Sequence, residues 1–126
     1  ITPTEKEARL AVRDNRSGLV GISEKVRQAT NVSNIPITLG SEGVFLHRPD
    51  SDGKGWADDQ VPALNDSPVD VSGAGDAFLV ATAMSMASGA DVWSAVLVGS
   101  VASACQVGKL GNTPLSRREL SARLRS

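Results

Sequence analysis

A glycine-rich turn that carries one acid stands out in this sequence: Gly73-Ala74-Gly75, followed directly by Asp76. The residues after it, 77–88, are mostly small and apolar and contain no Pro or Gly, which predicts a buried helix that begins at the turn. Free N–H groups at a helix start bind anions, phosphate above all. A carboxylate beside a phosphate is unfavourable unless it has a task, and taking a proton from an attacking hydroxyl is such a task. Asp76 is therefore a candidate general base.

A structural explanation accounts for the same residues. An Asp in the first turn of a helix stabilises the helix macrodipole without any catalysis. Gly-Ala-Gly also forms ordinary tight turns, because glycine adopts backbone conformations that a Cβ would hinder. Local chemistry alone does not decide between these two explanations.

The composition is that of a soluble globular chain with one domain at most. The sequence has 126 residues, of which 40% are hydrophobic and 21% charged, and this length suffices for a core. The net charge of -1 and the aromatic content of 3% give no case for nucleic acid or an anionic membrane as a partner. We expect a cytoplasmic location, because neither a signal peptide nor an apolar run of membrane length is visible.

The single cysteine and the single histidine limit other chemistry. Cys105 has no second thiol to pair with, and its apolar helical surroundings predict a buried structural thiol. His47 is the only histidine, so we expect no metal cluster of Cys and His. The chain begins at Ile1 in what looks like the middle of a fold, which suggests a fragment.

Helices and short strands are expected around the glycine-rich turn. Thr4 and Glu7 have the spacing of a capping box at a helix start. Apolar runs on both sides of residues 40–43 predict a hairpin, and Trp56 could begin a further edge strand. The expected helices are 5–12, 18–29, 74–88, 92–108 and 117–124, and the expected strands are 35–39, 44–47 and 60–64.

The helix expected at 92–108 is apolar nearly all round, which predicts burial on more than one side. The residues that predict this burial are Trp93, Leu97, Val98, Val101, Ala102 and Cys105.

The nine-residue string from Asp70 to Phe78 resembles the C-terminal signature of the PfkB family of carbohydrate kinases, which have the ribokinase-like fold. The family pattern is Asp, any residue, Thr or Ser, Gly, Ala, Gly, Asp, any residue, Phe. The matching residues are Asp70, Ser72, Gly73, Ala74, Gly75, Asp76 and Phe78. The resemblance implies an α/β chain, the C-terminal part of a three-layer α/β/α fold. Residues 1–126 would be its nucleotide-binding portion, with the N-terminal sugar-binding part missing.

The resemblance also implies a reaction: ATP-dependent phosphorylation of a hydroxyl on a sugar or sugar phosphate. Gly73, Ala74 and Gly75 would form an anion hole, in which the amides of Ala74, Gly75 and Asp76 act as preorganised donors. Asp76 would be the general base. The cofactors would be ATP and Mg²⁺, with K⁺ as a further ion.

Two residues are candidates for the ion sites. Glu7 matches the Glu of an Asn-x-x-Glu motif of the family, which helps to hold Mg²⁺ through water. Thr4 replaces the Asn of that motif, and a plain helix cap remains the alternative for both residues. Asp70, with the loop around Gly111, resembles the K⁺ site of ribokinase-like enzymes.

Five further residues would lie near the nucleotide. Thr38, Gly40 and Gly43 stand in a Thr-Leu-Gly-x-x-Gly string that resembles the family's hairpin beside phosphate and ribose; an ordinary hairpin explains it equally well. In the kinases that this chain resembles, adenine lies against the helix expected at 92–108, at a position that aligns with Gly99 and Ser100. Tight helix packing is the alternative explanation for these two residues.

Within the family, residues 69–76 and 107–112 look like heptose-7-phosphate kinases of the ADP-heptose synthase type. The alternatives are a non-catalytic nucleotide-binding or regulatory module and a vitamin or nucleoside kinase of the same fold. We expect the 126-residue chain alone to be inactive and to leave apolar residues of helices 18–29 and 92–107 partly uncovered. Such a surface favours a homodimer or association with the missing N-terminal part.

Overall fold

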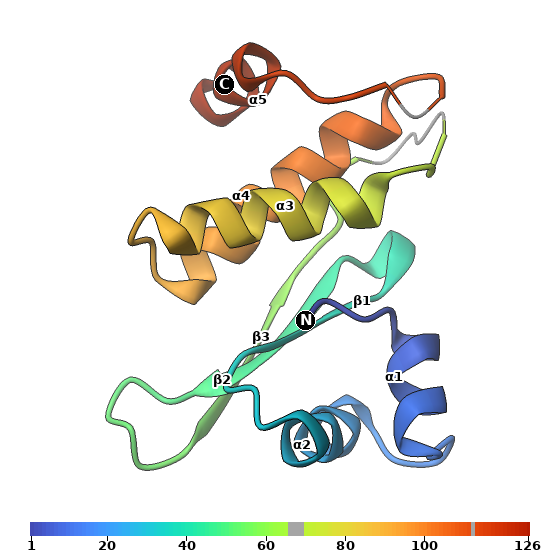
Figure 1. Ribbon diagram of the computed structural model, residues 1–126, viewed down its shortest axis with the longest axis vertical. Helices are drawn as coiled ribbons and strands as arrows, with labels where there is room; N and C mark the ends of the chain where they lie inside the picture. The colour runs from blue at the N-terminus through green and yellow to red at the C-terminus, as the bar shows by residue number, and fades with distance from the viewer. Residues whose placement is uncertain (66–69, 112) are drawn as a thin grey trace. The chain divides into compact units, whose positions relative to one another are not determined.

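The computed structural model describes residues 1–65, 70–111 and 113–126. The chain forms two compact units, Ile1–Pro62 and Ala63–Ser126, which are here called unit 1 and unit 2 and described separately. Unit 1 contains a sheet and two helices, and unit 2 contains three helices (Figure 1). In the described residues, no helix has the length and apolarity needed to cross a membrane.

The sheet of unit 1 is antiparallel, with the order β1-β2-β3. The strands are β1 (Ile35–Thr38), β2 (Val44–Pro49) and β3 (Trp56–Val61). A short 3-10 turn, η1 (Gly40–Glu42), joins β1 to β2, so the predicted hairpin is confirmed. Gly43 ends the turn at φ 95°, a left-handed conformation that favours glycine.

The edge strand expected to begin at Trp56 is confirmed as β3, whereas the separate strand predicted at 60–64 is wrong, because β3 ends at Val61. Its middle residues, Asp58 and Asp59, are poor strand formers by propensity. Both acids are compensated from β2, since Asp58 contacts His47 and Asp59 accepts a hydrogen bond from Arg48 Nε at 2.9 Å. Cross-strand charge pairs of this kind stabilise a sheet.

Two helices pack on the sheet of unit 1: α1 (Glu5–Val12) and α2 (Leu19–Thr30). Both were predicted to within one residue at each end. Apolar side chains from the two helices and from β1 form one core. The buried members are Ala8, Ile22, Val26, Ile35 and Ile37.

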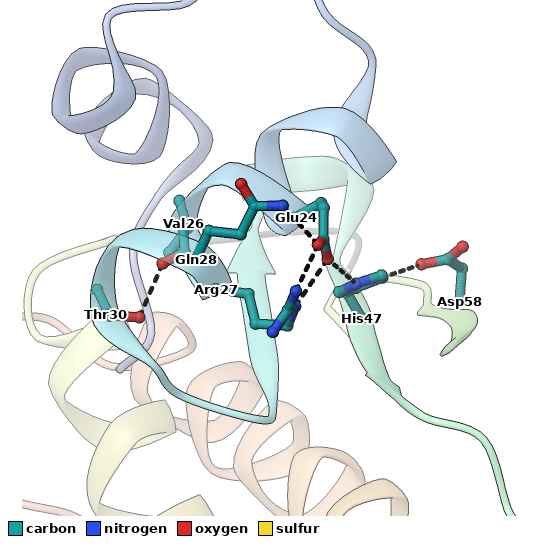
Figure 2. Close-up of polar contacts among 7 residues, drawn as sticks. All are labelled: Glu24, Val26, Arg27, Gln28, Thr30, His47 and Asp58. Atoms are coloured by element: carbon teal, nitrogen blue, oxygen red, sulfur yellow. Dashed lines mark hydrogen bonds and ion pairs between the residues drawn. The ribbon is translucent and has the colours of Figure 1, made fainter. Parts of the chain in front are cut away.

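A polar cluster also joins α2 to β2 and β3, as Figure 2 shows. His47 is 2% exposed, and its Nδ1 lies 2.7 Å from Oδ1 of Asp58. Its Nε2 lies 3.5 Å from Oε2 of Glu24. Glu24 also accepts hydrogen bonds from Arg27 Nε at 2.7 Å and Gln28 Nε2 at 2.8 Å. These bonds, Arg27 first, lower the pKa of Glu24 to about 2.

Unit 2 is built on a helical pair. The helices are α3 (Ala74–Ala87), α4 (Val92–Val107) and α5 (Arg117–Arg125). α3 and α4 lie side by side (Figure 1), joined by a short turn in which Gly89 has φ 95°. Asp91 caps α4 by accepting a hydrogen bond from the Ser94 amide at 3.0 Å.

The burial predicted for α4 is only partly correct. Of the six residues expected to be buried, Ala102 is buried, whereas Trp93 and Leu97 are exposed. The buried residues of α4 are Ala95, Val96, Gly99, Ser100, Ala102 and Gln106. Small residues at 95, 99 and 102 recur at helical spacing and form the face on which another helix can pack closely. The larger apolar residues therefore turn away from that face.

The expectation of partly uncovered apolar residues is confirmed for this chain. On α2, Val20 is exposed, as are Trp93 and Leu97 on α4. α3, which was expected to be buried, also exposes large apolar side chains, with Met84 66% exposed. Cys105 is only half-buried rather than buried, and this burial raises the pKa of its thiol.

Candidate phosphate and nucleotide site

The turn that enters α3 leaves two backbone amides open. Gly73 caps the helix at φ 75°, a left-handed conformation, and α3 begins at Ala74. The Ala74 N–H donates to the carbonyl of Val71 at 3.3 Å, within the turn. The amides of Gly75 and Asp76 donate to no acceptor among the described residues. Two of the three predicted donors are thus free to bind an anion at the positive end of the helix.

Gly75 leaves space above these amides. A Cβ built on Gly75 would have no atom within 4 Å. The side chain of Asp76 is exposed, and within the described part of the chain it forms no hydrogen bond or ion pair. A carboxylate without a partner next to free amides is the arrangement expected of a base beside a phosphate. Its position in the first turn also suits the helix macrodipole, so the structural explanation stands as well.

Asp70 joins the turn before α3 to the loop after α4. Its Oδ1 accepts a hydrogen bond from the Ser72 amide at 2.8 Å, and its Oδ2 accepts one from the Gly111 amide at 3.0 Å. Its own amide donates to the carbonyl of Val107 at 3.1 Å. Hydrogen bonds from the hydroxyl and amide of Ser72, and from the Gly111 amide, hold the pKa of the Asp70 carboxyl below its usual range. Asn112 lies outside the described residues, as do 66–69.

Gly99 and Ser100 are buried in unit 2. A Cβ on Gly99 would lie 2.1 Å from Oγ1 of Thr82 and 3.0 Å from the Phe78 ring, so close contact with α3 accounts for this glycine. The Ser100 hydroxyl donates to the carbonyl of Val96 at 2.9 Å. The packing alternative explains both residues, and their contact with adenine stays a prediction.

In unit 1, the start of α1 and the end of β1 lie side by side. The Thr38 amide donates to the carbonyl of Pro3 at 2.9 Å, and Thr4 forms a parallel bridge with Thr38. Gly40 follows immediately with φ 60°. The structure thus brings Thr4 close to the predicted nucleotide hairpin, although the two were assigned to different motifs.

Glu7 forms the predicted capping box with Thr4. Its Oε2 accepts hydrogen bonds from the Thr4 amide at 2.8 Å and from the Thr4 hydroxyl at 2.9 Å. These bonds, that of the backbone amide first, lower the pKa of Glu7. Oε1 has no hydrogen-bond partner among the described residues, so the carboxylate can still face a water of an ion.

The residues present fit a water-mediated Mg²⁺ rather than a protein cage. Residues 1–65, 70–111 and 113–126 contain no group of three or more His, Cys, Asp or Glu that could hold a metal. Mg²⁺ in phosphoryl-transfer sites keeps several waters and uses one or two carboxylates with substrate phosphates. A single exposed carboxylate such as Glu7 meets that need.

One contact of this region was missed by the sequence. Asn65 Nδ2 donates to the carbonyl of Ala104 at 3.0 Å and so holds the segment before residue 66 against α4. The sequence placed Asn65 only at the start of a loop. No local signal marks it, because its partner stands 39 residues further along the chain.

Comparison with known proteins identifies the family. Residues 1–118 match the model of the pfkB family carbohydrate kinases. The chain belongs to this family. Its relative HldE, a bifunctional protein of Bradyrhizobium diazoefficiens, is 35% identical over 127 residues, which cover 98% of the chain and 25% of the relative.

Solved structures show the same fold. Arabidopsis thaliana ribokinase, solved with ribose and ATP, is 23% identical with a TM-score of 0.79, and the match covers 99% of this chain and 40% of that one. Escherichia coli phosphofructokinase-2, solved with potassium, is 16% identical with a TM-score of 0.82, covering 98% and 39%. The α/β ribokinase-like fold is thereby confirmed. The chain spans well under half of the proteins it matches.

Proposed function

We propose that this chain is the C-terminal, nucleotide-binding part of a kinase that transfers a phosphoryl group from ATP to a hydroxyl of a sugar or sugar phosphate. The observation that carries the proposal is the pair of free amides at Gly75 and Asp76, beside a carboxylate without a partner. Membership of the carbohydrate kinase family supports the choice of substrate class.

The residues of the α3 turn would act on the transferred phosphoryl group. The amides of Gly75 and Asp76 stabilise the negative charge of its oxygens in the transition state, since they are fixed donors at a helix start. The Asp76 carboxylate takes the proton of the acceptor hydroxyl as its oxygen attacks the phosphorus. Mg²⁺, when bound, neutralises charge on the phosphate oxygens, and Glu7 would orient one of its waters.

Thr38, Gly40 and Gly43 would contact the phosphates and ribose of ATP, and Gly99 and Ser100 its adenine. The left-handed glycines of the β1–β2 turn allow backbone to approach a ligand closely, because no Cβ stands in the way. Asp70 would contribute to a K⁺ site, since each of its oxygens accepts a backbone amide and the carboxylate is charged. The potassium complex of the similar phosphofructokinase-2 supports that assignment.

For the acceptor we propose a heptose phosphate. The support is the 35% identity to HldE, together with the strings at residues 69–76 and 107–112 that look like those of heptose-7-phosphate kinases. We further infer a cytoplasmic enzyme that associates as a homodimer or with its N-terminal part.

A non-catalytic nucleotide-binding module is the second candidate. The observation in its favour is Thr4 in place of the Asn of the family motif, with Glu7 already engaged by the helix cap. Such a module would bind ATP without turnover. A vitamin or nucleoside kinase would turn over, but on a different acceptor.

The test is Asp76→Asn in the full-length protein that carries this chain. We expect the rate of phosphoryl transfer to fall by about 10²–10⁴-fold, the usual contribution of a general base, with nearly unchanged ATP affinity. Asp91→Asn is the matched control, because Asp91 is also an acid at a helix start of unit 2 but serves as a cap. Turnover of the Asp76 variant at the wild-type rate would exclude Asp76 as the base. ATP binding without turnover in the wild type would favour the module.

A further inference from the structure

Asp70 connects two loops that are far apart in the sequence. The turn before α3 contributes the Ser72 amide, and the loop after α4 contributes the Gly111 amide, 41 residues from Asp70. A third bond runs from the Asp70 amide to the carbonyl of Val107, at the last residue of α4. The entry to α3 and the exit from α4 are thus pinned to each other at one residue.

This arrangement needs a carboxylate. Both oxygens of Asp70 accept backbone N–H groups, and an Asn side chain has only one oxygen to offer. The bond to Ser72 alone is an ordinary local turn, since Asp52 accepts the Lys54 amide at 2.9 Å in the same way. The bond to Gly111 is what sets Asp70 apart. Gly111 adopts φ 72°, so its amide direction depends on a left-handed residue.

We propose that Asp70 is a positioning residue: it clamps the loop after α4 to the turn before α3 and so fixes where the Gly75 and Asp76 amides and the Asp76 carboxylate stand. The proposal rests on the proposed kinase function for its catalytic consequence. It differs from the role of Asp70 as a K⁺ ligand, because the clamp acts through Ser72 and Gly111 whatever ion is present. Asp70 itself touches no reacting atom.

Catalysis depends strongly on such positioning. A displacement of about 1 Å in a reacting group costs on the order of 10²-fold in rate. A looser α3 turn should therefore lower kcat more than it raises the KM for ATP, since the donors are needed most in the transition state.

The experiment compares Asp70→Asn and Asp70→Ala in the full-length protein, in K⁺ and in Na⁺. Asn keeps an acceptor for Ser72 but presents an N–H₂ group to the Gly111 amide, so both variants lose the clamp. We expect kcat to fall by about 10–100-fold in both variants in Na⁺, where the proposed K⁺ site contributes nothing, with the KM for ATP within about threefold, and to fall at least as far in K⁺. Gly111→Ala loosens the loop from the other side and should reproduce the kcat loss. Asp52→Asn, which has the local turn without the long-range bond, should stay at the wild-type rate.

A second readout does not depend on activity: hydrogen exchange of the Gly111 amide, followed by NMR. It should accelerate in Asp70→Asn and Asp70→Ala and stay unchanged in Asp52→Asn. Unchanged Gly111 exchange would overturn the clamp. An Asn variant with wild-type kinetics would overturn it too, as would variants that match the wild type in Na⁺ and lose only the K⁺ response. If the wild type shows no kinase activity, the proposed function fails, and the exchange measurement still decides whether the clamp exists.

Discussion

Gly99 of α4 and Thr82 of α3 lie so close that a Cβ at position 99 would stand 2.1 Å from the Thr82 Oγ1. Both residues are buried, and the Thr82 hydroxyl has no hydrogen-bond partner among residues 1–65, 70–111 and 113–126. This contact sets how closely the two helices can approach, because backbone of α4 rests directly on a side chain of α3. Because Gly99 has no Cβ, α4 can pack this closely against α3, the helix that begins at the proposed phosphate turn.

Replacing Gly99 by Ala should destabilise unit 2 despite the better helix propensity of Ala. Overpacking costs about 1–3 kcal/mol, which exceeds the gain of about 1 kcal/mol from replacing a helical Gly. Thr82→Ala in the same chain should relieve the clash and recover part of the loss. Urea unfolding followed by circular dichroism measures both variants. A Gly99→Ala chain more stable than the wild type would contradict the packing described here.

Replacing Glu7 by Gln should separate its two roles. Gln serves a capping box as Glu does, so helix α1 should form unchanged. The negative charge is lost, so the full-length protein should need more Mg²⁺ to reach half-maximal rate. Glu119→Gln is the control, since Glu119 forms the same box with Ser116 in α5. An unchanged Mg²⁺ requirement in the Glu7 variant would show that Glu7 serves only as part of the helix cap.

Acid should loosen the loop between α1 and α2 through Asp14. This carboxylate accepts hydrogen bonds from Lys25, from the hydroxyl and amide of Ser17 and from the Arg16 amide, and these bonds, Lys25 first, hold its pKa well below the usual range. A depressed folded pKa gives stability that is present above the unfolded pKa of about 3.9 and is lost as pH falls through the folded value. The urea concentration at the midpoint of unfolding should therefore fall as the pH is lowered below about 4. Asp14→Asn should flatten that dependence, and Asp52→Asn should not.

Activity of the full-length protein should depend on potassium, because the proposed K⁺ site consists of Asp70 and the loop to Gly111, which a hydrogen bond joins. The assay compares K⁺, Na⁺ and a bulky organic cation at equal ionic strength. Equal rates in all three would remove the proposed site.

The 126-residue chain by itself should self-associate and fail to phosphorylate a sugar. Val80 and Met84 on α3 and Trp93 and Leu97 on α4 expose apolar surface, which favours association. Sedimentation velocity and a coupled kinase assay check the two parts. A monomer that turns over a sugar at ordinary rates would contradict both.

Sequence reasoning succeeded where structure is set locally. The helix starts at Thr4, Asp91 and Ser116 were readable because each cap reaches only three residues along the chain. The start of β3 at Trp56 was readable, but its course through Asp58 and Asp59 was not, because these acids fit a strand only with His47 and Arg48 opposite them.

The candidate site divides in the same way. The amides at the start of α3 follow from a local glycine pattern. The bond from Asp70 to Gly111 spans 41 residues and has no local signature, so only the resemblance to the K⁺ site of ribokinase-like enzymes brought the two segments together. The buried face of α4 was predicted only in part: tight packing at Gly99 and Ser100 was one stated alternative, but apolarity alone wrongly placed larger side chains such as Trp93 in the interior.

The stack around Trp56 has an optical consequence. The ring centroids of Trp56 and His47 lie 5.0 Å apart, and Cζ of Arg27 lies 4.5 Å from the Trp56 ring centroid. The only other tryptophan in the sequence, Trp93, is on α4, so each unit carries one fluorophore in a different environment. Single-tryptophan chains, with Phe at the other position, would let the melting of each unit be followed by its own emission. The unfolding of the two units can thus be followed separately while a nucleotide is added.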